Sequence, residues 1–319
     1  MKNIYFLLIA VVFVVSCDKK DKVEEAIDEI SVELEVERFE KEFYGSKPEN
    51  LASLKEKFPD FFPLGNEDAV WIEKMNDTLQ QEFNAEVQKK FSDFSKQTAD
   101  LEELFRHIKY YYPDVKMPKV ITTLSDFDPN TKAIYTSKFL IIPLDLYLGS
   151  EHRFYEDFPN YQKFDFNESQ LLPNVVGAFS AGLIPQPKDR TLLSQMVYYG
   201  KKMYLMDLLI PKVSDADKIG YTPEQIVWGQ ENEGFIWRYF IDENLLYDSD
   251  PKLPGRFINP APFSKFYLEI DNESPGKIGV WIGWQIVRSY MKNNDVSLQQ
   301  LLQTDAKEIF DNSKYKPKK

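Results

Sequence analysis

The sequence has few of the side chains that most often carry out chemistry. Its 319 residues include one cysteine, Cys17, and two histidines, His107 and His152. A single cysteine leaves no partner for a disulfide within the chain, even in a compartment that permits one. A catalytic zinc ion is generally held by three nitrogen, oxygen or sulfur ligands, and no H-E-x-x-H motif is present. Asp126 and Asp128 lie close in sequence but lack calcium-loop spacing, so we expect no metal site and no cofactor.

Recognisable nucleophile and acid–base motifs are missing as well. Ser180 lacks the first glycine of a G-x-S-x-G turn and lies within a helical pattern, which indicates packing. Glu231 and Glu233 are two residues apart and do not share a helix face, so a solvated or capping role is expected. One of them could instead be buried and act as the acid of a glycan-cleaving enzyme. His107 follows Arg106 on a predicted amphipathic helix, which indicates an exposed or supporting position. We assign no catalytic residue.

Clustered positive charge is also scarce. The chain has 39 Lys and Arg against 51 Asp and Glu, which gives a formal net charge of -12. Proteins that bind nucleic acid gather Lys and Arg on one face, so this composition argues against a nucleic-acid partner. The interpretation that fits best is a solvated acidic surface.

The only long apolar run lies at the amino terminus, at residues 4–15. It is too short to span a bilayer, which takes about 20 residues, and it is typical of a signal peptide, here 1–16. The sequence Val14-Val15-Ser16-Cys17 is similar to a bacterial lipobox. We expect cleavage before Cys17 and acylation of its thiol and new amine by chains such as palmitate, which would anchor the protein in a membrane of the cell envelope. Polar residues follow, so 17–30 is predicted as a tether and 31–319 as one globular domain.

Hydrophobic spacing predicts a mostly helical body with a small sheet, an α+β fold. The chain is organised around 171–210, where two helical patterns are separated by Pro185 and Pro187, with Ser169 and Thr191 as predicted N-caps. Short strands with alternating or branched residues are predicted at 31–37, 120–124, 133–136 and 139–142.

Further along the chain, Thr222 and Gln225 predict a helix that begins with a capping box and runs to about Asn244. The aromatic segment 145–167 and the proline-rich segment 248–259 are predicted as surface loops. Gly279 and Gly283 share one face of an apolar helix from 278 to 291, which lets another helix approach closely. Ser297 and Gln300 resemble a capping box for the last helix.

Several stretches resemble the gliding motility lipoprotein family GldB of Bacteroidota. They are 192–204 (LLSQMVYYGKKMY), 221–225 (YTPEQ), Trp228 with 231–233 (ENE), 275–279 (PGKIG) and 283–287 (GWQIV). The resemblance implies an envelope lipoprotein of the gliding machinery, which is linked to type IX secretion, with protein partners there and no established catalytic residues. Residues alone do not indicate whether the anchor sits in the inner or the outer membrane.

The order of elements also resembles, at a distance, a zincin-like metallopeptidase. In such an enzyme the first central helix carries H-E-x-x-H and the second a Glu before a Gly. Here 171–182 has neither His nor Glu, and Tyr199 precedes Gly200. This likeness therefore implies a lost metal site and a cleft that still binds an extended peptide. Two alternatives to the motility hypothesis stay open: an envelope hydrolase that cleaves peptides or glycans, and a periplasmic binding module that uses the aromatic residues of 154–166.

Overall fold

The computed structural model describes residues 19–126 and 128–317, so the predicted signal peptide and Cys17 lie outside the described residues. Four short strands form one mixed sheet in the order β1-β2-β4-β3. β1 and β2 are parallel, β2 and β4 are parallel, and β3 closes the edge as an antiparallel partner of β4. The strands are β1 Val36–Arg38, β2 Lys119–Thr123, β3 Ile134–Tyr135 and β4 Phe139–Pro143. The predicted α+β class, mostly helical with a small sheet, is confirmed.

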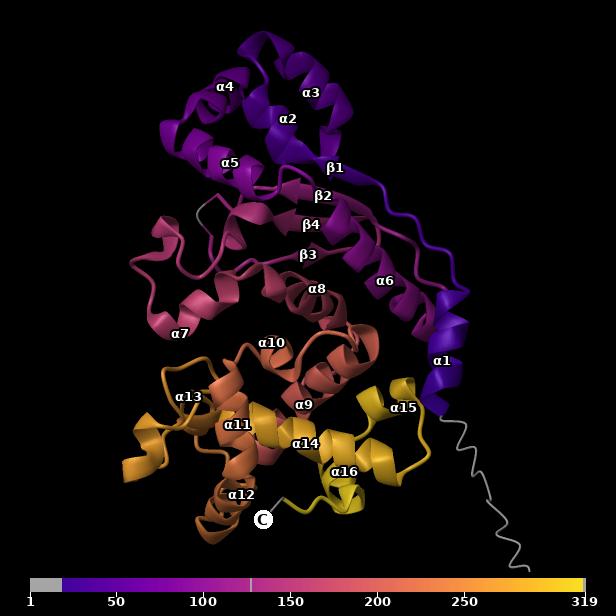
Figure 1. The fold of residues 1–319 in the computed structure, drawn as a ribbon, viewed down its shortest axis with the longest axis vertical. Helices are drawn as coiled ribbons and strands as arrows, with labels where there is room; N and C mark the ends of the chain where they lie inside the picture. The colour runs from indigo at the N-terminus through magenta and orange to yellow at the C-terminus, as the bar shows by residue number, and fades with distance from the viewer. Residues whose placement is uncertain (1–18, 127, 318–319) are drawn as a thin grey trace, which may run out of the picture.

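Four helices form one end of the elongated molecule, next to β1 (Figure 1). They are α2 Phe39–Gly45, α3 Leu51–Lys57, α4 Asp68–Asn76 and α5 Thr78–Lys90, with 3₁₀ turns at Pro48–Asn50 and Pro59–Phe61. Aromatic rings fill the space between them: Phe39 stacks on Phe43 with ring centroids 5.3 Å apart, and Phe62 meets Trp71 edge to face at 4.8 Å. Such pairs stabilise beyond their buried area.

The segment expected to be a tether contains a helix. α1 spans Lys19–Asp28, and Ile27 on it is only 2% exposed, packed beside α6 (Figure 1). After α1 the chain continues along the body, where the backbone N–H of Leu34 donates to Glu102 Oε1 at 3.2 Å. The described part of segment 17–30 therefore packs against the body and does not extend away from it.

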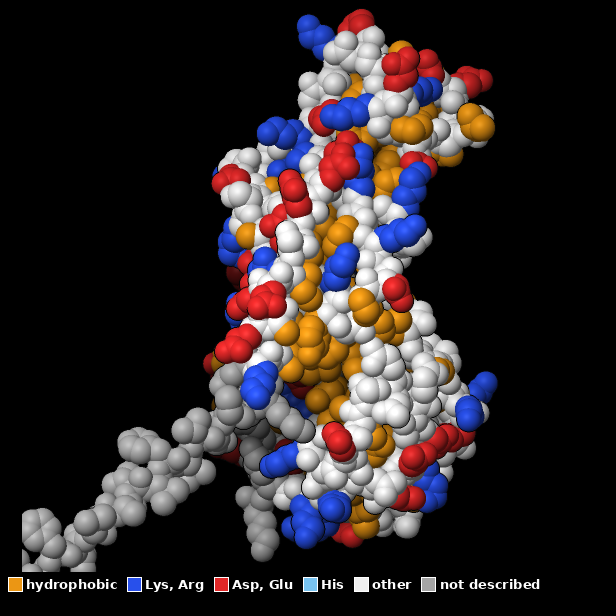
Figure 2. Space-filling model, turned by 90° about the vertical axis from the view of Figure 1, so that its right-hand side faces the viewer, with side chains coloured by type: hydrophobic (Ala, Val, Ile, Leu, Met, Phe, Trp, Pro, Cys, Tyr) orange, Lys and Arg blue, Asp and Glu red, His pale blue; other side chains and the backbone are white. Residues whose placement is uncertain are grey.

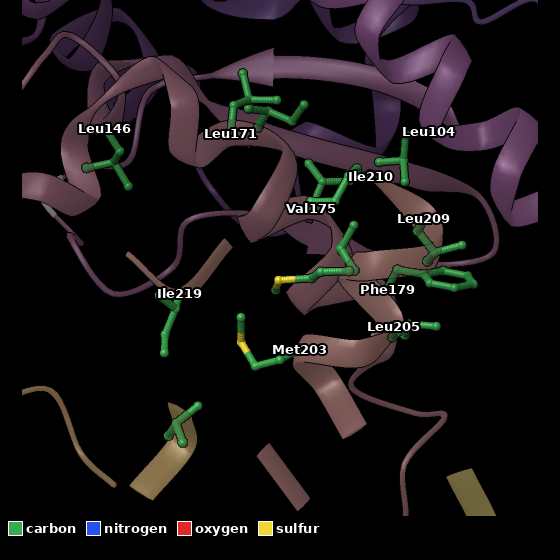
Figure 3. Packing of buried hydrophobic residues seen from close by; sticks show 14 of the residues in the cluster. Leu104, Leu146, Leu171, Val175, Phe179, Met203, Leu205, Leu209, Ile210 and Ile219 are labelled. Atoms are coloured by element: carbon green, nitrogen blue, oxygen red, sulfur yellow. The ribbon is translucent and has the colours of Figure 1, made fainter. Parts of the chain in front are cut away.

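Three helices join the sheet to the rest of the molecule. α6 spans Ser95–Tyr111, α8 spans Leu171–Ser180 and α9 spans Leu192–Leu209. Figure 3 shows their apolar side chains turned toward a common core, with Leu104 from α6, Val175 from α8 and Leu205 from α9. The predicted helix pair at 171–210 is confirmed, and Thr191 caps α9 by accepting from the Ser194 N–H at 3.2 Å. Ser169 does not cap α8, because that helix begins after Gln170 without a side-chain cap.

The predicted surface loop at 145–167 is wrong. The chain folds there into short turns of helix, and Tyr147, Tyr155 and Phe166 are buried. Tyr155 and Phe166 stack with their centroids 4.0 Å apart and their planes 7° apart, so the aromatic side chains pack against one another. The turns of helix are Leu144–Leu146, Arg153–Tyr155, α7 Asn160–Lys163, Phe164–Phe166 and Glu168–Gln170.

The carboxyl-terminal half is helical. The capping boxes predicted at Thr222 and Ser297 are both present. The helix expected to reach Asn244 breaks at Asn232, and the predicted loop 248–259 contains a short helix. The helices are α10 Asp215–Ile219, α11 Pro223–Glu231, α12 Glu233–Asp242, α13 Leu253–Phe257, α14 Ile278–Asn293, α15 Leu298–Gln303 and α16 Ala306–Ser313, with a 3₁₀ turn at Glu269–Asn272. Buried apolar residues from Leu34 to Ile309 form one continuous cluster.

Candidate functional site

Helices α9 and α14 cross with their backbones in contact. A Cβ added to Gly283 on α14 would lie 1.9 Å from the carbonyl oxygen of Met196, and one added to Gly200 on α9 would lie 2.3 Å from the carbonyl oxygen of Gly283. Neither position has room for a side chain. The predicted close approach at Gly283 is confirmed, and a Cβ on Gly279 would lie 2.9 Å from the carbonyl oxygen of Phe257.

An ion network lies beside this crossing and joins α9, α10 and α14. Arg288 donates to Asp207 through Nε and Nη2, both at 2.7 Å, and to Asp215 at 2.8 and 2.9 Å. Trp284 Nε1 donates to Asp207 at 2.8 Å, and Lys218 Nζ donates to Asp207 at 3.0 Å. Two carboxylates therefore face two cations. We call these four charged residues, with Trp284, the junction network.

The junction network stabilises its own charges. Burial opposes the charge on Arg288, but the hydrogen bonds that it donates to Asp207 and Asp215 raise its pKa above the usual value. Burial likewise opposes the charge on Asp215, and Arg288 nevertheless lowers the pKa of that carboxyl. Groups held in their charged states with all partners satisfied are suited to fixing helices and poorly suited to proton transfer.

A buried carboxyl lies at the end of β4. Asp145 is 4% exposed, and its two oxygens accept from the backbone N–H of Ser125 at 2.7 Å and from the Ser125 hydroxyl at 2.5 Å. Burial raises the pKa of Asp145 to about 6, although the Ser125 hydrogen bonds oppose this shift. Perturbed carboxyls mark active sites in some proteins, but both oxygens here are engaged by one serine, which indicates a structural role.

Lys132 lies in the same region and also bears a buried charge. Its Nζ has no hydrogen-bond partner among the described residues and sits 3.6 Å from the ring centroid of Phe166, a cation–π contact. Burial lowers the pKa of Lys132 to about 8, while Asp165 and Asp145 act in the opposite direction. Sequence reasoning missed both groups: Asp145 begins the segment 145–167 that was predicted as a surface loop, and nothing in the sequence around Lys132 indicated that its Nζ is buried.

The two histidines lie apart. His107 is buried, with Nδ1 2.9 Å from the carbonyl oxygen of Leu208, so of the two predicted positions, exposed or supporting, the exposed one was wrong. Burial lowers the pKa of His107, and Glu24 of α1, with Oε2 3.9 Å from Nε2, opposes that shift. His152 instead pairs with Glu86 at 3.4 Å. Each histidine serves as a local packing and hydrogen-bonding group.

The other candidates from the sequence are also separated. Ser180 Oγ donates to the carbonyl oxygen of Gly177 at 2.9 Å, as expected for a packing residue. Glu231 ends α11 and is exposed, whereas Glu233 begins α12, is buried and accepts from the Tyr315 hydroxyl at 2.9 Å. Asp128 caps a turn by accepting from the Asn130 N–H. No cluster of three His, Cys, Asp or Glu that could hold a metal occurs within 19–126 and 128–317.

Apolar and aromatic side chains line two surface grooves beside α9 and α12. The first, about 390 Å³, lies beside α9 and is lined by Tyr198, Tyr199, Pro187, Pro251 and Pro254 among others. Lys202 Nζ lies 4.4 Å from the Tyr198 ring centroid, and Gln186 donates to the Tyr198 hydroxyl at 2.7 Å. The groove coincides with part of the segment 192–204.

The second groove, about 640 Å³, follows α12 and is lined by Phe235, Trp237, Arg238, Ile241 and Pro317 among others. Phe235 and Ile241 are exposed, as is Val227 on α11. Hydrophobic side chains also gather in a strip on the face shown in Figure 2, bordered by charges of both signs. Among the described residues, no helix is long and apolar enough to cross a bilayer.

Comparison with known protein families identifies the family of this chain. A family model described as gliding motility protein GldB matches residues 20–317. No curated protein and no solved structure matches the chain. The likeness to zincin-like peptidases therefore stays a prediction. The predicted family resemblance is confirmed over nearly the whole described length.

Proposed function

The chain belongs to the GldB family of gliding motility proteins, and we propose that it is a non-catalytic, lipid-anchored component of the gliding apparatus in the cell envelope. The observation that carries this proposal is the family match over 20–317 together with the lipobox-like Val14-Val15-Ser16-Cys17 that precedes it. The anchor residue is Cys17. Its acyl chains hold the protein at an inner or outer membrane, with the body facing the periplasm.

Acylation accounts for stable anchoring in physical terms. Each buried CH₂ contributes about 0.8 kcal/mol, so one chain binds marginally whereas two or three hold a protein firmly. The body then acts by contact with other proteins of the gliding and type IX secretion machinery. The groove beside α9 supports a role in contact, because tyrosine and proline side chains present rigid apolar surface with few rotamers to lose.

The experiment is a complementation test in the organism that encodes the protein. The deletion strain receives either the natural chain or a chain in which a cleavable secretory signal without a lipidated cysteine replaces residues 1–17. We expect the deletion to abolish colony spreading, the natural chain to restore it, and the acyl-free chain to fail although it is exported. Normal spreading and normal display of motility adhesins in the deletion strain would refute the role in gliding. Full rescue by the acyl-free chain would refute the need for the anchor.

A second candidate function is a periplasmic module that binds an extended peptide, and the groove beside α9 is the observation that favours it. The substitution pair Tyr198→Ala and Tyr199→Ala removes two rings from the groove, and Tyr110→Ala removes an exposed ring elsewhere as the control. Peptide-binding function predicts loss of spreading for the pair alone. The hydrolase alternative predicts release of fragments from peptides or peptidoglycan incubated with purified protein.

A further inference from the structure

The amino-terminal helix limits how far the body can stand from its anchor. Only Asp18 separates Cys17 from α1, which begins at Lys19. α1 is held to the body by buried Ile27 and by the approach of Glu24 to His107. A docked helix offers no slack comparable to a flexible tether. The end of the molecule where α1 begins must therefore lie close to the bilayer that holds the acyl chains.

That same end carries the carboxyl terminus. In Figure 1 the helices α2 to α5 occupy one end of the longest axis, and α1 begins toward the opposite end, where α12, α16 and the last described residues also lie. The chain thus brings its first and last described segments to one end of the body, with the sheet and α8 between them and α2 to α5.

The side chains of residues 314–317 alternate between the solvent and α12. Lys314 has a left-handed backbone (φ 52°) and ends α16, which turns the chain toward α12. The Tyr315 ring packs edge to face on Trp237 with centroids 5.2 Å apart, and its hydroxyl donates to Glu233. Pro317 lines the groove along α12. Lys314 and Lys316 are exposed between these inward residues, and the sequence continues with Lys318 and Lys319.

The charge at this surface differs from that of the whole chain. Arg238 lines the groove together with Glu231 and Asp242, Lys314 and Lys316 are exposed, and Glu233 is turned inward toward Tyr315. The formal net charge of -12 is spread over the entire protein. At physiological ionic strength, charges farther than about 8 Å from a surface are largely screened. The side chains at this end therefore decide how it meets an anionic surface: Arg238, Lys314 and Lys316 favour the contact, whereas Glu231 and Asp242 oppose it.

We propose that this carboxyl-terminal surface, made of Phe235, Arg238, Ile241, Lys314 and Lys316, lies against an anionic bilayer. The proposal rests on the proposed lipid anchor, which brings this end to the membrane. The lysines and Arg238 meet lipid phosphates, and Phe235 and Ile241 lie at the boundary between headgroups and acyl chains, as in other interfacial surfaces that combine apolar and basic side chains. Helices α2 to α5, with fully exposed Leu64 in the loop before α4, then project away from the membrane.

Vesicle binding tests the surface without the anchor. The protein is exported with a cleavable signal so that it begins at Asp18; this body keeps the whole described core, because the buried cluster lies within residues 34–309. We expect it to float with vesicles that contain phosphatidylglycerol, to float less at high salt, and not to float with phosphatidylcholine alone. The pair Lys314→Glu and Lys316→Glu should weaken binding by about tenfold or more.

A matched pair, Lys41→Glu and Lys47→Glu, changes the same number of exposed lysines at the α2 to α5 end and should leave binding unchanged. Equal binding to both kinds of vesicle, or equal loss from both pairs of substitutions, would overturn the proposal. If the body binds an envelope protein and does not bind vesicles, the proposal is also overturned and the surface is assigned to a protein partner.

Orientation is tested on the acylated protein. Cys17 is the only cysteine and its thiol is acylated, so Lys316→Cys and Leu64→Cys can each carry one fluorescent label. We expect lipid-borne quenchers to quench the label at 316 and to spare the one at 64. Equal quenching would refute this orientation. The complementation test with the acyl-free chain does not depend on these labels, so the anchor and the membrane-facing surface can fail separately.

Discussion

Two regions of this protein bury charged side chains in opposite ways. In the junction network, Arg288 faces Asp207 and Asp215, and the pKa values of Arg288 and Asp215 shift so that both charged forms are favoured. Near the end of β4, Asp145 and the Nζ of Lys132 are buried without an ion-pair partner among the described residues, and the pKa values of these groups shift toward the neutral forms, to about 6 and about 8. Burial is common to both regions, so burial alone does not set the direction of the shift.

What differs is the distance to an opposite charge. Bidentate hydrogen bonds of 2.7 to 2.9 Å join Arg288 to both carboxylates, and they outweigh the loss of water. Asp145 has only the neutral donors of Ser125, and Lys132 has an aromatic ring. The junction network should therefore resist changes of pH, whereas the β4 end should respond to them.

The largest effect is expected from Gly283→Ala, which tests whether the crossing of α9 and α14 positions the junction network. The new methyl would lie 1.9 Å from the Met196 carbonyl oxygen, so the helices must separate and pull Arg288 from Asp207. We expect a loss of about 3 kcal/mol or more in the free energy of unfolding, measured by urea denaturation. Gly177→Ala on α8, where nothing lies within 4 Å, is the control and should stabilise by up to about 1 kcal/mol. Equal effects would contradict the close crossing.

Arg288→Met removes the arginine of the junction network. It leaves Asp207 and Asp215 with Lys218 as their remaining cation. Removing one partner from a buried pair costs about 3–5 kcal/mol, and because the Arg288 side chain is 29% exposed we expect about 2–3 kcal/mol. Lys307→Met removes an exposed helical pair with Asp311 and should leave the free energy of unfolding almost unchanged. If the two variants lose the same stability by chemical denaturation, the network has no special role.

Asp145→Asn tests the comparison through the pH dependence of the free energy of unfolding. The folded pKa of Asp145, about 6, is above its unfolded value, so the folded state favours the protonated form. The stability contributed by this carboxyl is full below the unfolded pKa and is lost as pH rises through about 6. We expect the natural protein to lose up to about 2 kcal/mol between acid and neutral pH from this group, and the variant to lack that part of the slope. Parallel pH profiles for the two proteins would contradict this account.

Lys132→Met gives the smallest expected change. The folded pKa of Lys132 is lowered, so its charged form destabilises the folded state at neutral pH, and stability recovers as pH rises through about 8. Methionine keeps the apolar stem and removes the buried ammonium, although it also removes the cation–π contact with Phe166. We expect a gain of about 1 kcal/mol at neutral pH that shrinks in alkali, measured by thermal unfolding. A loss of stability at every pH would show that the ring contact dominates.

Local patterns in the sequence predicted much of the fold. Alternation and branched residues located three of the strands closely, and the capping residues Thr191, Thr222 and Ser297 start helices as expected. Segment 145–167 was misinterpreted because buried aromatic residues without a regular period give the same pattern as a surface loop. His107 was predicted to be exposed or supporting because its neighbour is Arg106, and its position on α6 in fact faces Leu208.

The junction network illustrates a signal that could have been used. Asp207 lies between apolar residues of α9, and Arg288 interrupts the apolar run of α14. Burying a single charge within an apolar helical stripe costs free energy unless an opposite charge pairs with it. Asp207 and Arg288 therefore each indicated that a partner exists. The sequence could not say which one, because the two lie 81 positions apart and meet only through the crossing of two helices.

The sequence by itself determined the class of fold, the helix starts at Thr191, Thr222 and Ser297, and the family, because these depend on residue types at short spacing. The lipobox-like motif is of the same kind. Tertiary structure alone decided that α1 packs against α6, that Gly200 and Gly283 meet, and that Tyr315 and Pro317 lie beside α12. These features join residues far apart in the chain, and such distances are set by how the helices pack against one another.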